Sequence, residues 1–249
     1  MTRRPSDEGS DRVALSTGHE VALPLETEAA AVGAAFAGNA SAVDAALPDP
    51  LAPVRIAPGR APVVFVGVGY RRIGDGAMAA YDEFGLLLPA THHPEDGPFG
   101  AERAAVRHGV GAYVDWLPVT TGPGCALGVE VWDYPKEVRA IDVVDGRARH
   151  RVTVGADGER VAELSVNRTP TVDGRLRATS FAGRGPVREI EHLLDGRIGG
   201  WPGGATLSLG SQPRADRLRE FGLADGQRAL ARIRFDGRFV VGRGELLPP

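Results

Sequence analysis

Lys136 is the side chain of this sequence best suited to nucleophilic chemistry, because 28 of the 29 basic residues are arginine and this one is lysine. A guanidinium stays protonated in proteins, whereas a lysine amine can lose its proton and attack a carbonyl carbon. An arginine-rich composition explains the positive charges of the surface and leaves the lysine unexplained. A lysine that forms a Schiff base is one interpretation, and a stray surface lysine is the other.

The lysine lies in the segment 128–137, Gly-Val-Glu-Val-Trp-Asp-Tyr-Pro-Lys-Glu, which also supplies two carboxylates, Glu130 and Glu137. A carboxylate close to a lysine raises the pKa of the amine, keeps it protonated and so opposes nucleophilic attack. Neighbouring residues of an extended strand point to opposite sides. We therefore expect the side chain of Glu137 to point away from that of Lys136.

A second group of candidates lies near the segment 81–85, Tyr-Asp-Glu-Phe-Gly. Tyr81 and Glu83 are two residues apart on an expected strand, so their side chains share one face and can enter the same cavity. Arg71 and Arg72 are candidates for binding an anionic group of a substrate. A solvated strand face or an ordinary ion pair is the alternative for each charged residue.

Other catalytic chemistries lack the residues that they need. The segment 67–72 begins like a dinucleotide-binding fingerprint but lacks the third glycine and a following helix. The adjacent residues His92 and His93 would point apart on a strand, and we expect them in a solvated loop. Cys125, the single cysteine, can form neither an internal disulfide nor a multi-thiolate zinc site. We expect no metal and no cofactor.

The composition is that of a soluble globular chain of 249 residues, with 43% hydrophobic and 24% charged residues. A net charge of −3 gives no general attraction for phosphate backbones, so nucleic acid is not an expected partner. No apolar run reaches the ~18 residues of a membrane-spanning helix, and residues 5–11 are polar where an export signal needs an apolar core. We expect a cytoplasmic protein with no membrane partner.

The 34 glycines and 19 prolines favour many short strands and turns over long helices. Apolar or alternating runs predict a hairpin over 13–24 with Gly18 at its turn, and strands over 62–70, 81–91, 111–121 and 126–132. Alanine-rich or proline-bounded stretches predict helices over 26–36, 41–47 and 214–221. Asp-Gly pairs predict hairpin turns at 145–146, 157–158, 173–174 and 236–237.

These elements predict a mainly β (α+β) fold: an antiparallel, closed or nearly closed β-barrel with a few short peripheral helices. A barrel of this size can enclose an apolar cavity, in which a lysine can be kept neutral. The sequence has no internal repeat and no long linker. We expect a disordered tail over 1–11 and a single domain over 12–249.

The segment 128–137 resembles the lysine motif of the acetoacetate decarboxylase family, which consists of Gly-x-Glu, a few residues, Tyr or Phe, Pro and the Schiff-base lysine. The segments 42–48, 81–89 and 207–210 also follow the order of the family. The resemblance therefore covers most of the chain.

The resemblance implies roles for individual residues. Lys136 would form an imine, which accepts the electrons left behind when a β-keto acid loses carbon dioxide. Glu83 matches a pocket carboxylate that positions the substrate and handles protons, and Tyr81 would lie beside it. Glu130 matches the glutamate that precedes the lysine in the motif.

Three departures from the family pattern bear on the substrate. The family prototype has a second lysine, assigned to lowering the pKa of the first, where this chain has Glu137. His19 lies roughly where the prototype has an arginine thought to meet the substrate carboxylate, and the region 67–68 replaces a second pocket glutamate. Arg71 and Arg72 are candidates to substitute for the missing positive charge.

The sequence thus predicts a Schiff-base lyase that decarboxylates a small, acetoacetate-like β-keto acid through an imine on Lys136. One alternative keeps the imine and leads to aldol condensation, retro-aldol cleavage or dehydration of a keto acid. The other is a non-catalytic pocket for a small ligand. We expect a small-molecule keto acid as the partner and a homo-oligomeric assembly. The candidate catalytic residues are Lys136 and Glu83, and the candidate substrate-binding residues are Tyr81, Glu130, Arg71 and Arg72.

Overall fold

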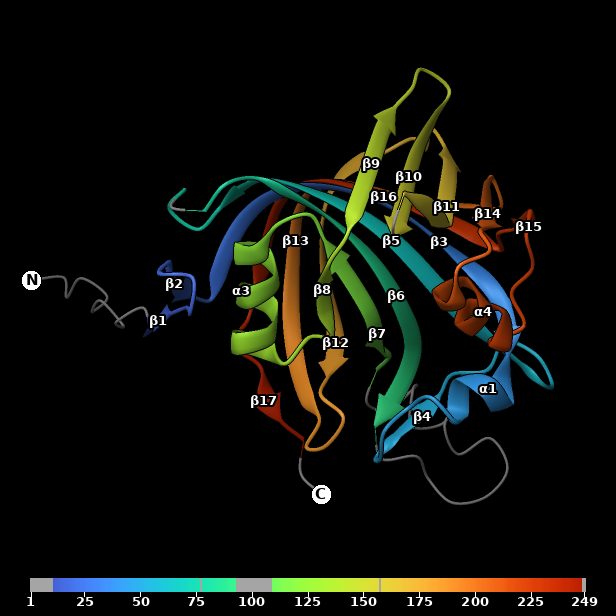
Figure 1. The fold of residues 1–249 in the computed structure, drawn as a ribbon, viewed down its shortest axis with the longest axis horizontal. Helices are drawn as coiled ribbons and strands as arrows, with labels where there is room; N and C mark the ends of the chain where they lie inside the picture. The colour runs from blue at the N-terminus through green and yellow to red at the C-terminus, as the bar shows by residue number, and fades with distance from the viewer. Residues whose placement is uncertain (1–10, 77, 93–108, 157, 248–249) are drawn as a thin grey trace, which may run out of the picture.

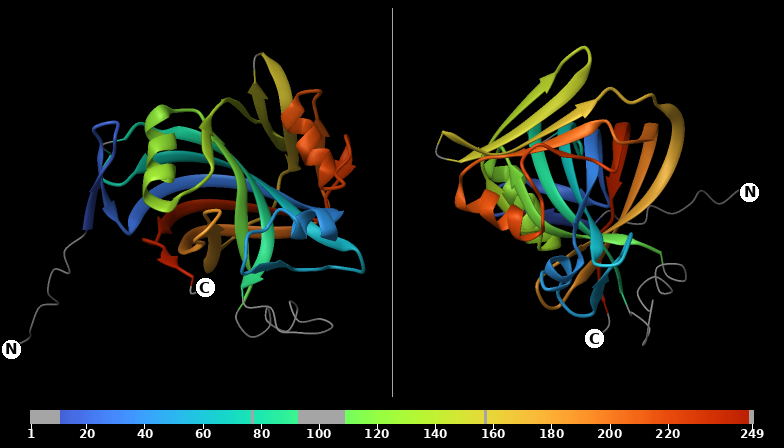
Figure 2. Two further views of the ribbon diagram at one scale, coloured as in Figure 1. Left: turned by 60° about the horizontal axis from the view of Figure 1, so that its bottom comes forward. Right: turned by 90° about the vertical axis from the view of Figure 1, so that its right-hand side faces the viewer.

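Seven strands close into a β-barrel in the described part of the chain. The computed structural model describes residues 11–76, 78–92, 109–156 and 158–247. The strands follow the order β6, β5, β3, β16, β13, β12 and β7 around the barrel, and pairing of β7 with β6 closes the ring (Figure 1, Figure 2). Their bounds are β3 Leu25–Asn39, β5 Arg60–Ile73, β6 Tyr81–His92, β7 Gly111–Val119, β12 Val172–Ala182, β13 Arg188–Pro202 and β16 Ala231–Val241.

The barrel is closed, in agreement with the prediction, but it is mixed rather than antiparallel. Among the described strands, β12 runs parallel to β7, and the other six neighbour pairs of the ring are antiparallel. Parallel neighbours need a long connection. Here the chain leaves β7, forms helix α3 (Gly122–Trp132) and most of a second sheet, and only then returns as β12.

The second sheet covers one outer side of the barrel (Figure 1). Its described strands follow the order β15, β14, β11, β10 and β9, with antiparallel pairing throughout. Their bounds are β9 Ala140–Asp145, β10 Arg149–Ala156, β11 Glu159–Asn167, β14 Ala205–Leu209 and β15 Gln227–Arg228.

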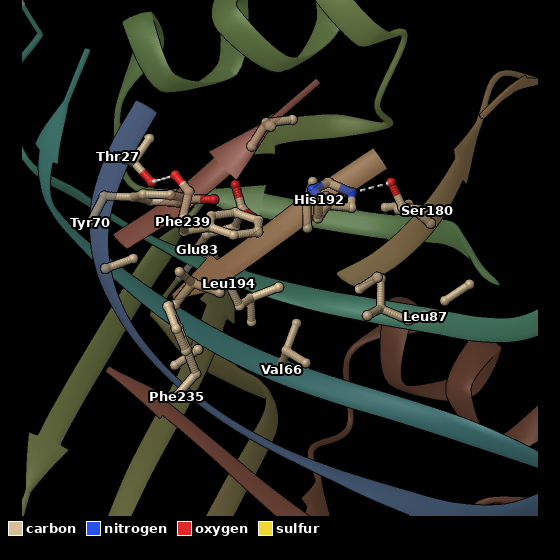
Figure 3. Close-up of a pocket in the computed structure, with 18 of the residues that line it drawn as sticks. Thr27, Val66, Tyr70, Glu83, Leu87, Ser180, His192, Leu194, Phe235 and Phe239 are labelled. Carbon is tan, nitrogen blue, oxygen red and sulfur yellow. Dashed lines mark hydrogen bonds between the residues drawn. The ribbon is translucent and has the colours of Figure 1, made fainter. Parts of the chain in front are cut away.

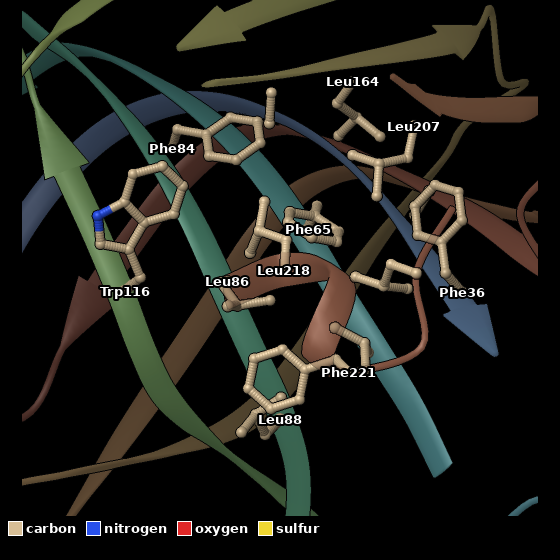
Figure 4. Close-up of a cluster of buried hydrophobic side chains, with 14 of the residues drawn as sticks. Phe36, Phe65, Phe84, Leu86, Leu88, Trp116, Leu164, Leu207, Leu218 and Phe221 are labelled. Carbon is tan, nitrogen blue, oxygen red and sulfur yellow. The ribbon is translucent and has the colours of Figure 1, made fainter. Parts of the chain in front are cut away.

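A large apolar cluster joins the barrel to this sheet and to helix α4 (Pro213–Glu220) (Figure 4). Phe65 and Phe84 leave barrel strands β5 and β6 on the side away from the barrel interior, and their ring centroids are 5.8 Å apart. Leu164 and Leu207 come from the sheet, and Leu218 comes from α4. The outer face of β5 and β6 is thereby buried, and the inner face of the barrel remains for a pocket.

The smaller predicted elements are largely confirmed. Strands β1 (Asp11–Ala14) and β2 (Glu20–Leu23) form a hairpin, and Gly18 takes a left-handed φ of 81° between them. Helix α1 (Ala40–Asp44) and helix α4 each begin one residue before the helices predicted at 41–47 and 214–221. Two short strands pair at the sheet margins: β4 (Leu51–Pro53) with β6, and β17 (Glu245–Leu246) with β13.

The helix predicted over 26–36 is wrong, because these residues belong to β3. Alanine has a high helix propensity, but tertiary packing overrides it here. Strand β3 lies between β16 and β5, where small side chains are needed. A Cβ on Gly33 would lie 2.8 Å from the carbonyl oxygen of Phe65.

The strand predicted over 126–132 is also wrong, because this segment forms most of helix α3. The Thr121 side chain caps the helix by accepting the Gly124 N–H at 3.2 Å, and Pro123 lies in the first turn. Both are ordinary signals for the start of a helix. The prediction gave more weight to the alternation of apolar and polar residues in the segment than to these two helix signals.

Two of the predicted Asp-Gly turns lie inside long strands. The pair 145–146 does turn the chain between β9 and β10, whereas 173–174 lies in β12 and 236–237 lies in β16. Gly237 faces Gly196 of β13, and a Cβ on Gly237 would collide with the backbone of that strand. These glycines allow two paired strands to approach closely rather than reversing the chain.

Some expectations fall outside the described residues, namely those for the tail up to residue 10, for His93 and for Asp157. The assignment of 12–249 to a single domain stays a prediction. Within the described ranges, no group of three or more His, Cys, Asp or Glu side chains is placed to hold a metal ion. No helix among these residues has the length and apolar character needed to cross a membrane.

Gly237→Ala is expected to lower the free energy of unfolding by about 1–3 kcal/mol, because the new methyl group collides with β13 at an unfavourable φ. Gly174→Ala is the matched control, since the nearest atom to its Cβ would be 4.0 Å away. Urea-induced unfolding measures both variants. Equal losses of stability would contradict the close approach of the two strands.

Candidate active site

A largely apolar pocket of about 340 Å³ lies inside the barrel, and all seven barrel strands contribute to its wall (Figure 3). Helix α3 adds Leu127 and Trp132 to one end of it. Strand alternation explains the lining, because the inward residues Val66 and Val68 of β5 alternate with outward residues such as Phe65. The polar residues that contribute to the lining are Thr27, Tyr70, Tyr81, Glu83, Tyr134, Lys136, Thr179, Ser180, His192 and Arg234.

The structure brings Lys136, Glu83 and Tyr81 together in this pocket. Nζ of Lys136 lies 2.7 Å from Oε2 of Glu83, and the two side chains are only 4% and 8% exposed. The same ammonium donates to the Tyr81 hydroxyl at 3.4 Å. An ion pair is thus held in an almost wholly apolar environment, with a phenol beside it.

The position of Lys136 follows from how helix α3 ends. Asp133 adopts a left-handed φ of 60°, and the N–H of Tyr134 bonds back to the carbonyl of Gly128. The chain then reverses into β8 (Lys136–Val138), which pairs with the end of β7. The lysine side chain passes against Gly128, where any Cβ would collide with Cδ and Cε of Lys136. The glycine of the segment 128–137 therefore makes room for the lysine.

The charge on Lys136 depends on Glu83. Burial lowers the pKa of the lysine amine, but the Glu83 carboxylate and the Tyr81 hydroxyl raise it more, so the net pKa is raised. Burial is also the main reason why the pKa of Tyr81 is raised to about 12, so its hydroxyl stays protonated at neutral pH. Transfer of one proton from Lys136 to Glu83 gives a neutral amine and a neutral acid, which an apolar pocket accommodates.

A row of three hydrogen-bonded polar side chains also lines the pocket, and it was not predicted from the sequence. The Tyr134 and Ser180 hydroxyls are 2.7 Å apart, and Ser180 Oγ lies 2.8 Å from Nε2 of His192 (Figure 3). The imidazole stacks on Phe239, and burial lowers its pKa to about 4, so it is neutral at pH 7. The only indication in the sequence that His192 lines the pocket was its spacing of two residues from Leu194, which places both side chains on one face of a strand.

Tyr70 is another lining residue that the sequence did not single out. Its ring centroid lies 4.8 Å from that of Tyr81, and burial raises its pKa well above the ordinary value. A protonated phenol at this place is a hydrogen-bond donor beside the ion pair. Tyr70 is the last residue of the strand predicted over 62–70.

Glu130, Arg71 and Arg72 do not line the pocket, which corrects the expectation that they bind substrate. Glu130 is exposed on the outer side of α3, where it accepts the Ser16 N–H at 2.9 Å and the Ser16 hydroxyl. Glu130 lies in helix α3, and the helix turns its side chain outward. The strand expected over 126–132 would have given the side chain another direction. Arg71 and Arg72 are exposed in ion pairs with Asp236 and Glu28, at 2.7 and 3.0 Å.

Glu137 points away from the pocket. The Trp116 Nε1 donates to its carboxylate at 2.5 Å, and Arg139 donates at 2.8 Å. Burial raises the pKa of this carboxyl, but the bonds from Arg139 and Trp116 lower it more. The carboxylate that faces Lys136 is therefore that of Glu83, contributed by a different strand.

Of the other two departures from the family pattern, one lies outside the pocket and the other lies partly in its wall. His19 is in the β1–β2 hairpin, within 3.0 Å of the Thr17 hydroxyl, and does not line the pocket. At positions 67–68, Val68 lines the pocket, whereas a Cβ on Gly67 would meet Val152 of the second sheet. No second carboxylate joins Glu83 among the described lining residues.

The fold and the pocket define a β-barrel protein with a buried lysine–carboxylate pair. The chain belongs to the acetoacetate decarboxylase (ADC) family, whose model matches residues 13–247. None of the curated proteins compared with this chain matches it in sequence.

Solved structures share the fold at low sequence identity. An acetoacetate decarboxylase from Legionella pneumophila has a TM-score of 0.65 at 12% identity, covering 90% of this chain and 87% of that one. The enduracididine biosynthesis enzyme MppR complexed with pyruvate gives 0.63 at 18%, covering 96% and 98%. An acetoacetate decarboxylase-like enzyme from Sphingomonas wittichii gives 0.62 at 17%, covering 90% and 92%.

Gly128→Ala is expected to slow the reaction of Lys136 with carbonyl compounds by about 100-fold, because the methyl group displaces the amine from its position beside Glu83. Gly122→Ala, in the first turn of the same helix, is the control, since its Cβ would have no neighbour within 4 Å. Trapping with borohydride followed by mass spectrometry measures the rates. A Gly128→Ala variant as reactive as the control would show that the glycine does not set the lysine position.

Glu83→Gln is expected to lower the pKa of Lys136, because the carboxylate that raises this pKa is removed while burial, which lowers it, remains. The pH at which imine trapping is half-maximal then moves downward. Glu137→Gln is the matched control and should move it little, because Glu137 bonds to Trp116 and Arg139. An unchanged or higher pH midpoint in Glu83→Gln would contradict the coupling.

Proposed function

We propose that this protein is a Schiff-base lyase that decarboxylates a β-keto acid through an imine on Lys136. The observation that carries the proposal is that the one lysine of the chain is buried in an apolar pocket with its amine 2.7 Å from a carboxylate. Membership of the acetoacetate decarboxylase family supports the same reaction. A buried amine that can pass its proton to a neighbour is the kind of nucleophile that attacks carbonyl carbons.

The reaction begins with a proton transfer from Lys136 to Glu83, which frees the amine lone pair. The amine attacks the ketone carbon of the substrate, and the proton held by Glu83 passes to the ketone oxygen. The amine proton then returns to Glu83 and leaves with the hydroxyl group as water. These steps give a protonated imine on Lys136 and a carboxylate on Glu83.

Decarboxylation follows from the positive charge of the imine. The bond between the α-carbon and the carboxylate breaks, carbon dioxide leaves, and the electron pair moves into the imine to give a neutral enamine. Glu83, reprotonated from solvent, donates a proton to the enamine carbon. Water then hydrolyses the resulting imine, which releases the ketone and restores the lysine. The phenols of Tyr81 and Tyr70 are the donors closest to the oxygen of the substrate carbonyl in this scheme.

Aldol condensation or dehydration of a keto acid is the second candidate, and the comparison structures give it a specific basis. MppR, which shares this fold, has been solved with pyruvate and with the condensation product of pyruvate and imidazole 4-carboxaldehyde. The neutral imidazole of His192 in the pocket is a further acid–base group for such a reaction. A non-catalytic pocket for a small ligand is the third candidate.

We further propose, from the sequence, that the protein works as a cytoplasmic homo-oligomer on a small-molecule keto acid. This assignment includes no cofactor, no nucleic acid and no membrane partner. The alternative assignments differ in what happens after the imine forms, so chemical trapping and product analysis distinguish them.

Lys136→Arg is expected to abolish turnover and imine trapping while the fold survives, because the charge is kept and the nucleophile is lost. Carbon dioxide release across a panel of 3-keto acids, with borohydride trapping of the wild type, is the measurement. Circular dichroism checks that the variant is folded. Turnover by the arginine variant would rule out the covalent mechanism.

The same panel separates the three candidates. A trapped adduct on Lys136 together with carbon dioxide release supports the decarboxylase. A trapped adduct with condensation or dehydration products, and without carbon dioxide, supports the second candidate. Ligand binding without any reducible adduct supports the non-catalytic pocket.

A further inference from the structure

We propose that the natural substrate carries an extended apolar substituent on the ketone carbon, on the side away from the carboxylate, and that this substituent lies along the barrel interior. The proposal rests on the proposed function for the identity of the reacting group. The pocket itself supplies the argument for the substituent.

The reactive groups of the pocket are gathered at one end. Lys136 and Tyr81 contact helix α3 through Gly128 and Gly124, and Leu127 and Trp132 of the same helix close the wall there. The Lys136 and Glu83 charges cancel within the ion pair. A keto acid bound to Lys136 therefore has its carbonyl carbon fixed at this end, and the rest of the pocket is left for its substituent.

The wall leading away from the lysine is apolar. Along β16 the lining runs from Val241 through Phe239 and Phe235 to Ile233, a stretch that spans roughly 25 Å at about 3.3 Å per residue. Other strands add Val66, Leu87 and Leu194 (Figure 3). Ile198 and Leu176 also belong to this lining. Arg234 also contributes to the lining, but its place between Ile233 and Phe235 turns its side chain to the outer face of the strand.

The size of the pocket exceeds what a short keto acid needs. An apolar cavity of about 150 Å³ is sufficient for benzene, and this pocket measures about 340 Å³. A short substrate would leave most of the apolar wall without a contact. An extended apolar substituent would fill that space and bury its own surface as well.

The far end of the pocket reaches solvent through apolar residues. Ile233, at the end of the β16 lining, is 48% exposed, and Leu176, which lies opposite Leu194 and therefore level with Phe239, is a 49% exposed part of the wall. The hydrophobic effect makes the affinity of such a path depend on the length of the substituent. Each methylene group that leaves water raises the affinity of the ligand about fourfold, which is equivalent to about 0.8 kcal/mol. The preference ends where the substituent emerges beyond Ile233.

A series of unbranched 2-alkanones from acetone to 2-nonanone tests the proposal with the wild-type protein. Titration calorimetry gives the dissociation constant for each ketone, and borohydride trapping measures the imine on Lys136 separately. Affinity is expected to rise by about three- to fivefold per methylene until the pocket is full. Equal affinity for acetone and 2-heptanone would overturn the proposal.

A matched pair of variants tests whether the substituent follows the predicted path. Leu176→Asn is expected to weaken binding of 2-nonanone at least fivefold more than it weakens binding of acetone. Leu230→Asn is the control, because Leu230 is 46% exposed but does not line the pocket. Equal effects of the two variants on 2-nonanone, or no effect of either, would overturn the assignment of the path.

Calorimetry and borohydride trapping test the extended substituent and the proposed function separately. A chain-length preference in calorimetry without any trapped adduct would disprove the imine chemistry and leave the apolar binding path established. A trapped adduct whose affinity does not depend on chain length would support the proposed function and disprove the extended substituent.

Discussion

The ion pair between Lys136 and Glu83 is the interaction on which the site depends. Desolvating two charges is costly, and one of them left alone in an apolar pocket would be far more costly than the pair. Moving one proton from Lys136 to Glu83 would remove both charges at once. Burial in the apolar barrel lowers the pKa of the amine, whereas the nearby carboxylate and the Tyr81 hydroxyl raise it more and keep the resting amine protonated.

The rest of the fold serves to hold these two side chains in place. Glu83 belongs to a barrel strand whose outer face is buried under the second sheet, so its orientation is fixed from both sides. Lys136 is positioned by the end of helix α3 and by the gap left at Gly128. Both residues lie in strands, β6 and β8, and the geometry therefore follows from the barrel and one helix.

The sequence predicted the barrel and pointed to Lys136, Glu83 and Tyr81, because composition, strand alternation and the lysine motif are local signals. It did not predict the crossover that makes β12 parallel to β7, since strand order is a property of long-range pairing. Glu130 was misplaced because a helix was taken for a strand. Ser180 and His192 were missed because their contact joins two strands whose registry no local pattern reveals.

The presence of a single lysine has a consequence for the protein as a whole. A protein that handles reactive ketones or aldehydes is exposed to adduct formation on every accessible primary amine. Here the positive surface charge is carried by arginines, whose guanidinium groups remain protonated and do not form imines. Apart from the N-terminal amine, the chain thus offers carbonyl compounds one amine, and it lies inside the barrel. Under the proposed function, the use of arginine in place of lysine would therefore also keep the surface free of adducts with the substrate.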